Sequence, residues 1–369
     1  MAAGSGFGKL FRITTWGESH GKGVGVVVDG CPAGLSLSEE DIQIYLNRRK
    51  PGTSRFTTPR KEDDCVEILS GVFEGKTTGT PISMVVFNKT QRSRDYSEIA
   101  SYYRPGHADY TYDKKYGFRD YTGGGRSSGR ETVGRVAAGA IAAKLLKEMG
   151  ITVDAYTKSI GPVGISEGNF DLEKRFENAV CMPDETAAAE AEKFLERCMK
   201  EQNSSGGVIE CRINGVPAGL GEPCFEKLSA SLGKAILSIG AVKGFEIGDG
   251  FEAAKSTGLE NNDAFYYNDA GEICKKTNHA GGILGGITDG SEIIFRAAVK
   301  PTPSVFSTQE TVNQSGENIS VNIKGRHDPV IVPRAVVVVE CMAAITILDA
   351  LLVNMSAMLE NIKGFYGKV

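Results

Sequence analysis

Hydrophobic and polar positions along the chain predict strands in some stretches and helices in others. Alternating or valine-rich runs are typical of strands, and they occupy residues 9–16, 23–29, 65–73, 81–88, 151–156, 207–213, 242–250 and 293–299. A further hairpin is predicted over residues 307–323, around Gln314 to Gly316. Capping residues, helix-forming composition or amphipathic spacing predict helices at residues 38–49, 133–149, 184–202, 222–239 and 333–360.

These elements follow one another irregularly, and no internal repeat, low-complexity tract or linker divides the chain. Irregular alternation differs from the regular βαβ units of a doubly wound fold. We therefore predict one α+β domain that covers residues 1–369. The polar, turn-rich stretch 253–280 is either disordered or a lid over a ligand, and its composition does not separate the two.

The longest apolar run spans residues 335–353 and contains Glu340 and Asp349. Each acidic residue would cost about 2.5–3.5 kcal/mol at a bilayer centre, so a buried core helix is predicted instead of a membrane span. Eight cysteines are scattered singly, with no CxxC pair, and the first eight residues lack the charged and apolar regions of a secretory leader. These features predict a reduced, cytoplasmic location.

The formal net charge is −4, from 42 basic and 46 acidic residues. A mildly acidic chain is not coated for nucleic acid or an anionic membrane, so chemistry on anions requires local clusters of basic residues. One such cluster occupies residues 48–61 and contains no acidic residue. Its members are Arg48, Arg49, Lys50, Arg55, Arg60 and Lys61. Such a density of one sign predicts a polyanionic ligand.

A second concentration of polar groups spans residues 104–131, with one histidine, four arginines and a triple glycine. Gly123 to Gly125 can adopt positive φ and bring backbone N–H groups against a ligand. Ser128, with a glutamate three residues later, has the spacing of a capping box at the start of the next helix. A glycine turn before a helix N-terminus favours anions, and Arg126 and Arg130 add charge there. A solvated loop before an ordinary helix remains the alternative.

Three histidines are predicted in loops, namely His20, His107 and His327. Histidine transfers protons near neutral pH, although a single histidine is more often structural. The second glycine cluster, residues 281–286, is either a close approach to a ligand or a tight turn beneath a sheet. No pair of histidines or cysteines has metal-ligand spacing, and a GxSxG elbow and a Walker loop are absent. A cavity for a multiply anionic ligand, with histidines that transfer protons, is therefore predicted.

Six segments together resemble the chorismate synthase family. They are, in order, GESHG (17–21), RRKPGTSRFTT (48–58), RPGHADYTY (104–112), GGGRSSGRET (123–132), NHAGGILGG (278–286) and GRHDP (325–329). No flavin-reductase segment accompanies them, so the chain resembles the monofunctional bacterial type. The resemblance implies a β-α-β sandwich with two antiparallel sheets and surrounding helices, assembled as a homotetramer.

The same resemblance implies an activity in the shikimate pathway of aromatic amino acid biosynthesis. A lyase of this family converts 5-enolpyruvylshikimate 3-phosphate to chorismate by 1,4-anti elimination of phosphate, and requires reduced FMN without net redox change. A separate flavin reductase or another source would supply the reduced FMN. The substrate carries two carboxylates and a phosphate, and arginine forks pair well with such groups.

The resemblance also implies roles for individual residues. His20 would act as a general acid at the leaving phosphate, His107 would protonate the reduced flavin, and Asp328 would assist proton removal. Substrate-binding candidates are Arg49, Arg55, Arg104 and Arg130, of which Arg49 and Arg55 also match positions assigned to NADP. FMN-binding candidates are Arg126, Ser127, Ser128, Gly240, Ala241, Gly285, Lys300, Pro301, Thr302, Pro303, Ser304 and Arg326. His279 and His327 are interpreted as structural.

Two other classes of function remain open. A single-stranded RNA or nucleotide-binding protein would stack bases on tyrosines 102, 103, 110, 112, 116 and 121. The acidic total charge does not require such a partner, and we expect a small-molecule substrate, with neither nucleic acid nor membrane as partner. A flavin-dependent oxidoreductase would consume reducing equivalents, whereas the lyase would not.

Overall fold

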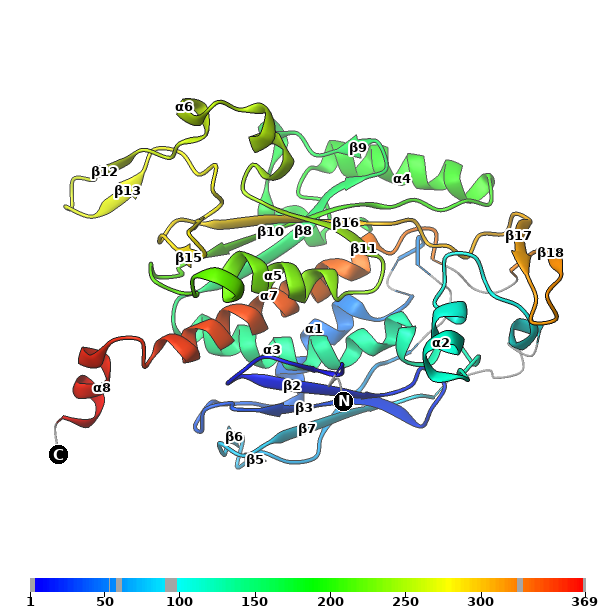
Figure 1. Ribbon diagram of the computed structural model, residues 1–369, viewed down its shortest axis with the longest axis horizontal. Coiled ribbons are helices and arrows are strands. Elements are labelled where there is room, and N and C mark those ends of the chain that lie inside the picture. The colour runs from blue at the N-terminus through cyan, green and yellow to red at the C-terminus, as the bar shows by residue number, and fades with distance from the viewer. Residues whose placement is uncertain (1–3, 53, 58–61, 90–97, 324–327, 368–369) are drawn as a thin grey trace.

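Two five-stranded antiparallel sheets face each other across a layer of helices in the computed structural model (Figure 1). The first sheet has the order β1-β2-β3-β7-β4, formed by Gly6–Phe7, Arg12–Gly17, Gly23–Asp29, Ile82–Phe87 and Val66–Ile68. The second has the order β11-β16-β10-β8-β9, formed by Val242–Ile247, Ile293–Val299, Gly207–Asn214, Thr152–Ile160 and Val163–Gly164. The structure describes residues 4–52, 54–57, 62–89, 98–323 and 328–367.

The helical layer between the sheets consists of α1 (Glu39–Arg49), α3 (Thr132–Glu148), α5 (Leu228–Leu237) and α7 (Val332–Asn354). Helix α3 packs on α7, α1 and β3, and α7 packs on β8 and β10. The predicted β-α-β sandwich of the α+β class is confirmed. The long helices lie between the sheets and do not surround them, because their apolar residues meet both sheets. Helix α4 (Glu185–Lys200) covers the outer side of the second sheet (Figure 1).

Helices α3 and α7 approach each other closely at the centre of the core. A Cβ on Gly139 would lie 2.2 Å from the Cβ of Cys341, so a larger residue does not fit there. Helix α7 is long and apolar enough to cross a membrane, yet 72% of its most apolar window is buried inside the protein. Glu340 is 4% exposed and accepts two hydrogen bonds of 2.7 Å from Arg48. The predicted core helix at residues 335–353 is confirmed.

The remaining elements are short. The strands are β5 (Val72–Phe73), β6 (Lys76–Thr77), β12 (Phe265–Tyr267), β13 (Ile273–Lys275), β14 (Ile283–Leu284), β15 (Ile287–Thr288), β17 (Gln309–Val312) and β18 (Asn318–Val321). The helices are α2 (Asp109–Tyr116), α6 (Gly258–Asn261) and α8 (Leu359–Tyr366). Short 3-10 turns are η2 (Glu98–Ser101), η3 (Gly125–Ser127), η4 (Gly129–Glu131), η5 (Glu167–Asn169), η6 (Leu172–Phe176), η7 (Cys224–Glu226) and η8 (Gly250–Lys255).

Local signals correctly predicted several boundaries. Strands β3 and β16 have the predicted limits, and Ser38 caps α1 in a capping box with Asp41. The single helix predicted at 333–360 is wrong at its C-terminal end, because α7 ends at Asn354 and α8 is separate. The buried residues of α7 end at Leu348, so the core no longer supports the helix beyond its last turns.

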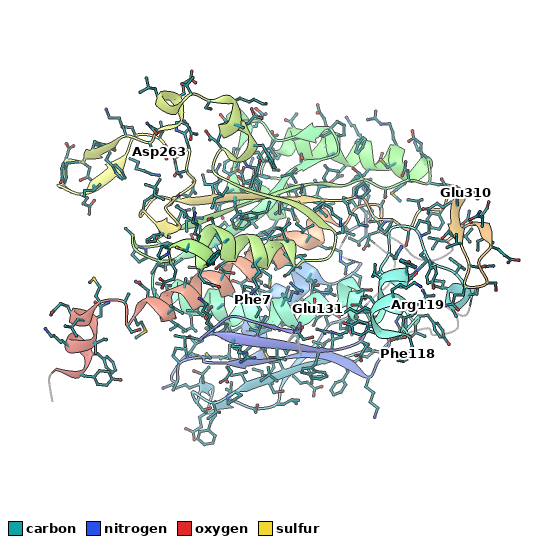
Figure 2. The ribbon with its side chains drawn as sticks, in the orientation of Figure 1. Phe7, Phe118, Arg119, Glu131, Asp263 and Glu310 are labelled. Carbon is teal, nitrogen blue, oxygen red and sulfur yellow. The ribbon has the colours of Figure 1, made fainter. Side chains whose placement is uncertain are left out.

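Residues 253–280, for which disorder and a lid were both open, are folded. They contain the end of η8, α6 and the hairpin β12–β13, which projects from one end of the molecule (Figure 1). Asp263 lies at the base of the hairpin (Figure 2). There the Lys275 side chain is 2% exposed and pairs with Asp263 at 3.2 Å and with Asp289 at 2.7 Å. Disorder is therefore excluded for this stretch, while a lid function stays a prediction.

The imidazole of His279 belongs to the same anchor. Its Nδ1 lies 3.0 Å from Oδ1 of Asp263, and Asp263 also accepts the backbone N–H groups of His279 and Ala280. These contacts support the structural interpretation of His279, because its backbone N–H is bound to Asp263 at the base of the hairpin and its ring lies against the same carboxylate.

Candidate active site

The turn between β2 and β3 places His20 against the triple glycine. Ser19 Oγ donates to the Gly123 carbonyl at 3.2 Å and lies 3.2 Å from Nδ1 of His20. A Cβ on Gly123 would lie 2.1 Å from the imidazole ring, and Gly123 has a φ of +72°. Glycine is therefore required here both for space and for backbone conformation. Two motifs separated by 104 positions in the sequence meet at this contact.

Arg104 lies beside the second glycine of the same turn. Its Nη2 lies 3.8 Å from the position of a Cβ on Gly124. The guanidinium donates two hydrogen bonds of 2.8 Å to Asp109, the first residue of α2, in a bidentate pair. The side chains of Arg104 and Asp109 are 9% and 5% exposed. Asp109 therefore fixes the direction of a buried cation beside the glycine turn.

His107 joins the Arg104 motif to the segment that follows β16. Its Nδ1 lies 3.0 Å from the Pro105 carbonyl and its Nε2 lies 3.0 Å from Ser304 Oγ. The carbonyl can only accept, so Nδ1 carries a hydrogen and Nε2 accepts from the serine hydroxyl in the neutral ring. Burial and the nearby Arg104 guanidinium lower the pKa of His107 to about 4. His107 is therefore neutral near pH 7 in the ligand-free protein.

The segment Lys300–Ser304 lies under the same loop. Lys300 Nζ donates to the Gly106 carbonyl at 2.8 Å, and Lys300 N donates to the Ala241 carbonyl at 2.9 Å. A Cβ on Gly106 would lie 2.7 Å from Pro303. Thr302 Oγ1 is buried, and none of the described residues offers it a hydrogen-bond partner. The predicted flavin segment Lys300, Pro301, Thr302, Pro303 and Ser304 thus lies beside Gly240 and Ala241.

Arg49 and Arg130 share one buried carboxylate, that of Asp64. Arg49 Nη2 donates to one oxygen at 2.6 Å and Arg130 Nη1 donates to the other at 2.7 Å. The side chains of Arg49, Arg130 and Asp64 are 3%, 6% and 0% exposed. Despite burial, the two guanidinium groups hold the pKa of Asp64 below its usual value. Two of the four predicted substrate-binding arginines are therefore brought together.

The glycine turn leads into two 3-10 turns before α3. Ser127 Oγ donates to the Gly124 carbonyl at 2.7 Å, and Ser128 Oγ accepts from Arg130 N at 3.3 Å. The predicted capping box is wrong in its second half, because the Glu131 carboxylate does not accept a hydrogen bond from the backbone N–H of Ser128. Glu131 instead accepts from Thr15 Oγ1 at 2.8 Å and from Arg135 Nε, one turn further along α3, at 2.8 Å, so a tertiary partner and a different local partner replace Ser128.

Arg126 crosses from this turn to the first sheet. Its Nη2 donates to Thr15 Oγ1 at 2.7 Å and its Nη1 donates to the Gly17 carbonyl at 3.3 Å. These contacts link the glycine turn to the end of β2, from which the His20 turn begins.

Asp328 is connected to the arginine pair through Arg334 on α7. Arg334 Nη1 donates to Asp328 at 2.7 Å, and Arg334 Nε donates to the Arg49 carbonyl at 3.0 Å. Arg326 and His327 lie outside the described residues, and the predictions made for them stay predictions.

Two predicted site residues, Arg55 and Gly285, do not lie with His20, Arg130 and the Lys300–Ser304 segment within one chain. The Arg55 side chain is 60% exposed and pairs with Glu192 and Glu196 of α4 at 2.7 and 2.9 Å. Gly285 lies in the turn between β14 and β15, before β16, whereas Lys300 follows β16. The seven residues of β16 span about 23 Å. Their assigned roles stay predictions.

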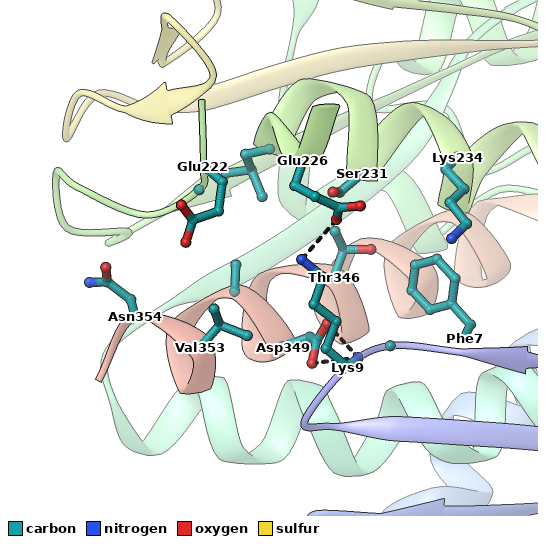
Figure 3. A pocket seen from close by; sticks show the side chains of 14 residues that line it. Phe7, Lys9, Glu222, Glu226, Ser231, Lys234, Thr346, Asp349, Val353 and Asn354 are labelled. Carbon is teal, nitrogen blue, oxygen red and sulfur yellow. Dashed lines mark hydrogen bonds and ion pairs between the residues drawn. The ribbon is translucent and has the colours of Figure 1, made fainter. Parts of the chain in front are cut away.

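A pocket of about 120 Å³ lies elsewhere, between α5, α7 and the turn after β1 (Figure 3). Asp349 in this pocket accepts the backbone N–H groups of Lys9, Leu10 and Phe11. Lys9 Nζ pairs with Glu226 at 2.9 Å (Figure 3). These polar groups are already satisfied by one another, and no predicted site residue lines the pocket.

Sequence reasoning missed Asp64, Asn88 and Asp109, which hold the predicted arginines in place. The Asn88 oxygen accepts from Arg130 Nε, and its Nδ2 donates to the Gly21 carbonyl at 2.9 Å. The excess of arginine within a few motifs was a usable signal, because buried guanidinium groups require carboxylate or amide partners.

The chain matches the family model for chorismate synthase over residues 11–352. It is 70% identical over 367 residues to the chorismate synthase of Agathobacter rectalis, with 100% of both chains covered. The chain belongs to the chorismate synthase family. It is also 52% identical to the chorismate synthase of Cytophaga hutchinsonii, over 96% of this chain and 99% of the relative.

A crystal structure of chorismate synthase has the same fold. The two superpose with a TM-score of 0.76 at 32% identity, covering 98% of this chain and 97% of the other. Chorismate synthases are carbon–oxygen lyases that form chorismate from 5-enolpyruvylshikimate 3-phosphate by elimination of phosphate, and this is the activity of the chain. Family membership therefore selects the lyase over the RNA-binding or nucleotide-binding protein and the oxidoreductase that the sequence left open.

Proposed function

We propose that the surface formed by His20, Arg104, His107, Arg130 and the Lys300–Ser304 segment is where 5-enolpyruvylshikimate 3-phosphate is bound and loses its phosphate, with reduced FMN as cofactor. The observation that carries this proposal is the contact of His20 with Gly123, because it joins a proton-transferring group to a glycine turn suited to anions. Arg104 lies beside the next glycine of that turn.

The residues present fit a flavin phosphate and the polar edge of a flavin ring. The Thr302 hydroxyl is buried without a partner among the described residues, and a buried polar group of this kind favours a ligand that satisfies it. The Lys300 ammonium is a further donor in the same segment, because its bond to the Gly106 carbonyl uses only one of its three hydrogens. Reduced FMN, when bound, supplies reducing power that is returned within each turnover. In this proposal Lys300–Ser304, Ser127, Ala241 and Arg126 hold it.

His20 is suited to proton donation at the leaving phosphate. The Ser19 hydroxyl donates to the Gly123 carbonyl, so its oxygen accepts from Nδ1 of His20. Nε2 is then the nitrogen that gains and loses the transferable proton. Phosphate leaves more readily when this proton neutralises its developing charge.

His107 needs a change of environment before it can donate a proton. The pKa of His107 is lowered to about 4 by burial and by Arg104, so a donor role near pH 7 requires an anion bound nearby. An anionic reduced cofactor or a substrate carboxylate would raise that pKa by favouring the imidazolium. Ligand binding would therefore prepare His107 for protonation of the flavin, while Asp328, held by Arg334, would assist removal of the C6 proton.

Further assignments belong to this proposal. Arg49 pairs with Asp64, whereas Arg55 pairs with a glutamate of α4. Both arginines would therefore contact NADP only if that one ligand reaches both places. A homotetramer in the cytoplasm, supplied with reduced FMN by a separate reductase, is supported by the resemblance of the motifs.

The test is anaerobic turnover of 5-enolpyruvylshikimate 3-phosphate with chemically reduced FMN, followed by phosphate release and the flavin spectrum. We expect chorismate and phosphate in equal amounts with catalytic flavin. A stoichiometric loss of reduced flavin would contradict the redox-neutral proposal, and an absence of flavin binding would contradict the cofactor assignment.

A further inference from the structure

Asn88, directly after β7, connects two parts of the proposed site. Its Nδ2 donates to the carbonyl of Glu18 at 3.1 Å and to that of Gly21 at 2.9 Å. These carbonyls flank Ser19 and His20 in the turn between β2 and β3. The Asn88 oxygen accepts a hydrogen bond from Nε of Arg130. One amide group therefore holds both the turn that presents His20 and the guanidinium that is proposed to bind substrate.

Arg130 is fixed at two of its three nitrogens. Asn88 binds Nε and Asp64 accepts from Nη1 at 2.7 Å. Nη2 is buried, and none of the described residues provides an acceptor for it. A buried donor without an acceptor is costly, and the side chain is only 6% exposed. The two protein contacts thus leave one nitrogen of a buried cation without an acceptor among the described residues.

Asparagine is well suited to this position because the contacts require one acceptor and two donors on the same group. Aspartate would accept from Arg130 but would face the carbonyls of Glu18 and Gly21 without a hydrogen to donate. Alanine would satisfy neither side. Backbone contact adds to the link, since Asn88 N donates to the Lys22 carbonyl at 3.0 Å. The position is therefore defined by hydrogen bonds on both sides.

We infer that Asn88 is a positioning residue for the elimination, which holds the proton donor His20 and the anion-binding group Arg130 in one fixed relation. This inference rests on the proposed function of His20 and Arg130. Misplacement of a reacting group by about 1 Å can cost about 10²-fold in rate, so the link matters even though Asn88 itself touches no reacting atom.

A pair of double-mutant cycles tests the inference. Asn88→Ala is made in the wild-type chain, in His20→Ala and in Arg130→Ala, and kcat and KM are measured anaerobically with reduced FMN. We expect Asn88→Ala alone to lower kcat by about 10-fold or more and to raise KM by about 3-fold or more. In the His20→Ala background kcat should no longer respond to Asn88→Ala, and in the Arg130→Ala background KM should no longer respond.

Asn214 provides the matched control. It lies at the end of β10, and its Nδ2 donates to Glu292 at 3.0 Å in an exposed setting. Asn214→Ala should leave kcat and KM within about 2-fold of wild type. If Asn88→Ala does not fold by circular dichroism, Asn88→Ser replaces it in both cycles.

The outcomes separate the two proposals. Equal fold-losses from the Asn88 substitution in all three backgrounds would overturn the positioning role, as would wild-type kinetics in Asn88→Ala. Failure of the wild-type chain to form chorismate would instead contradict the proposed function.

Discussion

The imidazole of His20 lies against Gly123 so closely that a Cβ on the glycine would be 2.1 Å from the ring. This contact joins a turn of the first sheet to the segment that begins α3. Any side chain at position 123 must therefore displace the histidine, the glycine turn or both.

Gly123→Ala is expected to lower kcat by about 10-fold or more, because a shift of His20 misplaces the proton donor. Gly117→Ala is the matched control, since Gly117 also has a positive φ, of +76°, but has open space around its Cβ position. Both substitutions impose backbone strain, and only the first adds the clash. Steady-state kinetics of the two variants checks the prediction, and equal effects would attribute the loss to strain.

His20→Ala and His107→Ala are each expected to lower turnover by about 10²-fold or less, at the lower end of the contribution that one general acid or base usually makes. The kcat values are compared under anaerobic conditions with saturating reduced FMN. His279→Ala serves as the comparison, because His279 contacts the Asp263 anchor of the β12–β13 hairpin. Wild-type turnover in His20→Ala or His107→Ala would contradict the role of that residue.

His107 should make the stability of the ligand-free protein depend on pH. The folded-state pKa of about 4 lies below the unfolded value near 6.5, so the unfolded chain binds the proton first as pH falls. The contribution of neutral His107 to the free energy of unfolding is therefore fully present above pH 6.5. It is lost as the pH falls from about 6.5 to 4, and it amounts to roughly 3 kcal/mol or less. Urea unfolding across this range should give a flatter dependence for His107→Gln, and an unchanged slope would contradict the assignment.

Asp64→Ala should destabilise the fold strongly, because it leaves the guanidinium groups of Arg49 and Arg130 buried beside each other without a counter-charge. Breaking a buried ion pair costs about 3–5 kcal/mol. The control is Glu252→Ala, whose pair with Lys255 is exposed and should contribute less than about 1 kcal/mol. Denaturant unfolding of both variants measures the difference, and similar losses would refute the structural importance assigned to Asp64.

Features that depend on neighbours in the sequence were predictable. The Ser38 and Asp41 capping box, the limits of β3 and β16 and the hairpin β17–β18 all follow from short-range patterns. Candidate motifs were also visible, because local enrichment in glycine, arginine and histidine can be recognised in the sequence without structural information.

Features that depend on distant partners were not predictable from the residues themselves. Glu131 has the spacing to cap its own helix but bonds to Thr15 of β2, because a tertiary partner competes with the local one. Asp64 is an unremarkable acidic residue in the sequence, and only the fold brings Arg49 and Arg130 to it. The position of the long helices between the sheets likewise depends on which helix faces pack against which sheet.

The most direct measurement is a crystal structure of the protein with FMN and 5-enolpyruvylshikimate 3-phosphate. We predict that the flavin contacts Ser127 and the Lys300–Ser304 segment, and that the substrate phosphate lies within hydrogen-bonding distance of His20. A flavin bound instead in the pocket beside Asp349 (Figure 3), or a substrate remote from His20 and Arg130, would contradict this account of the active site.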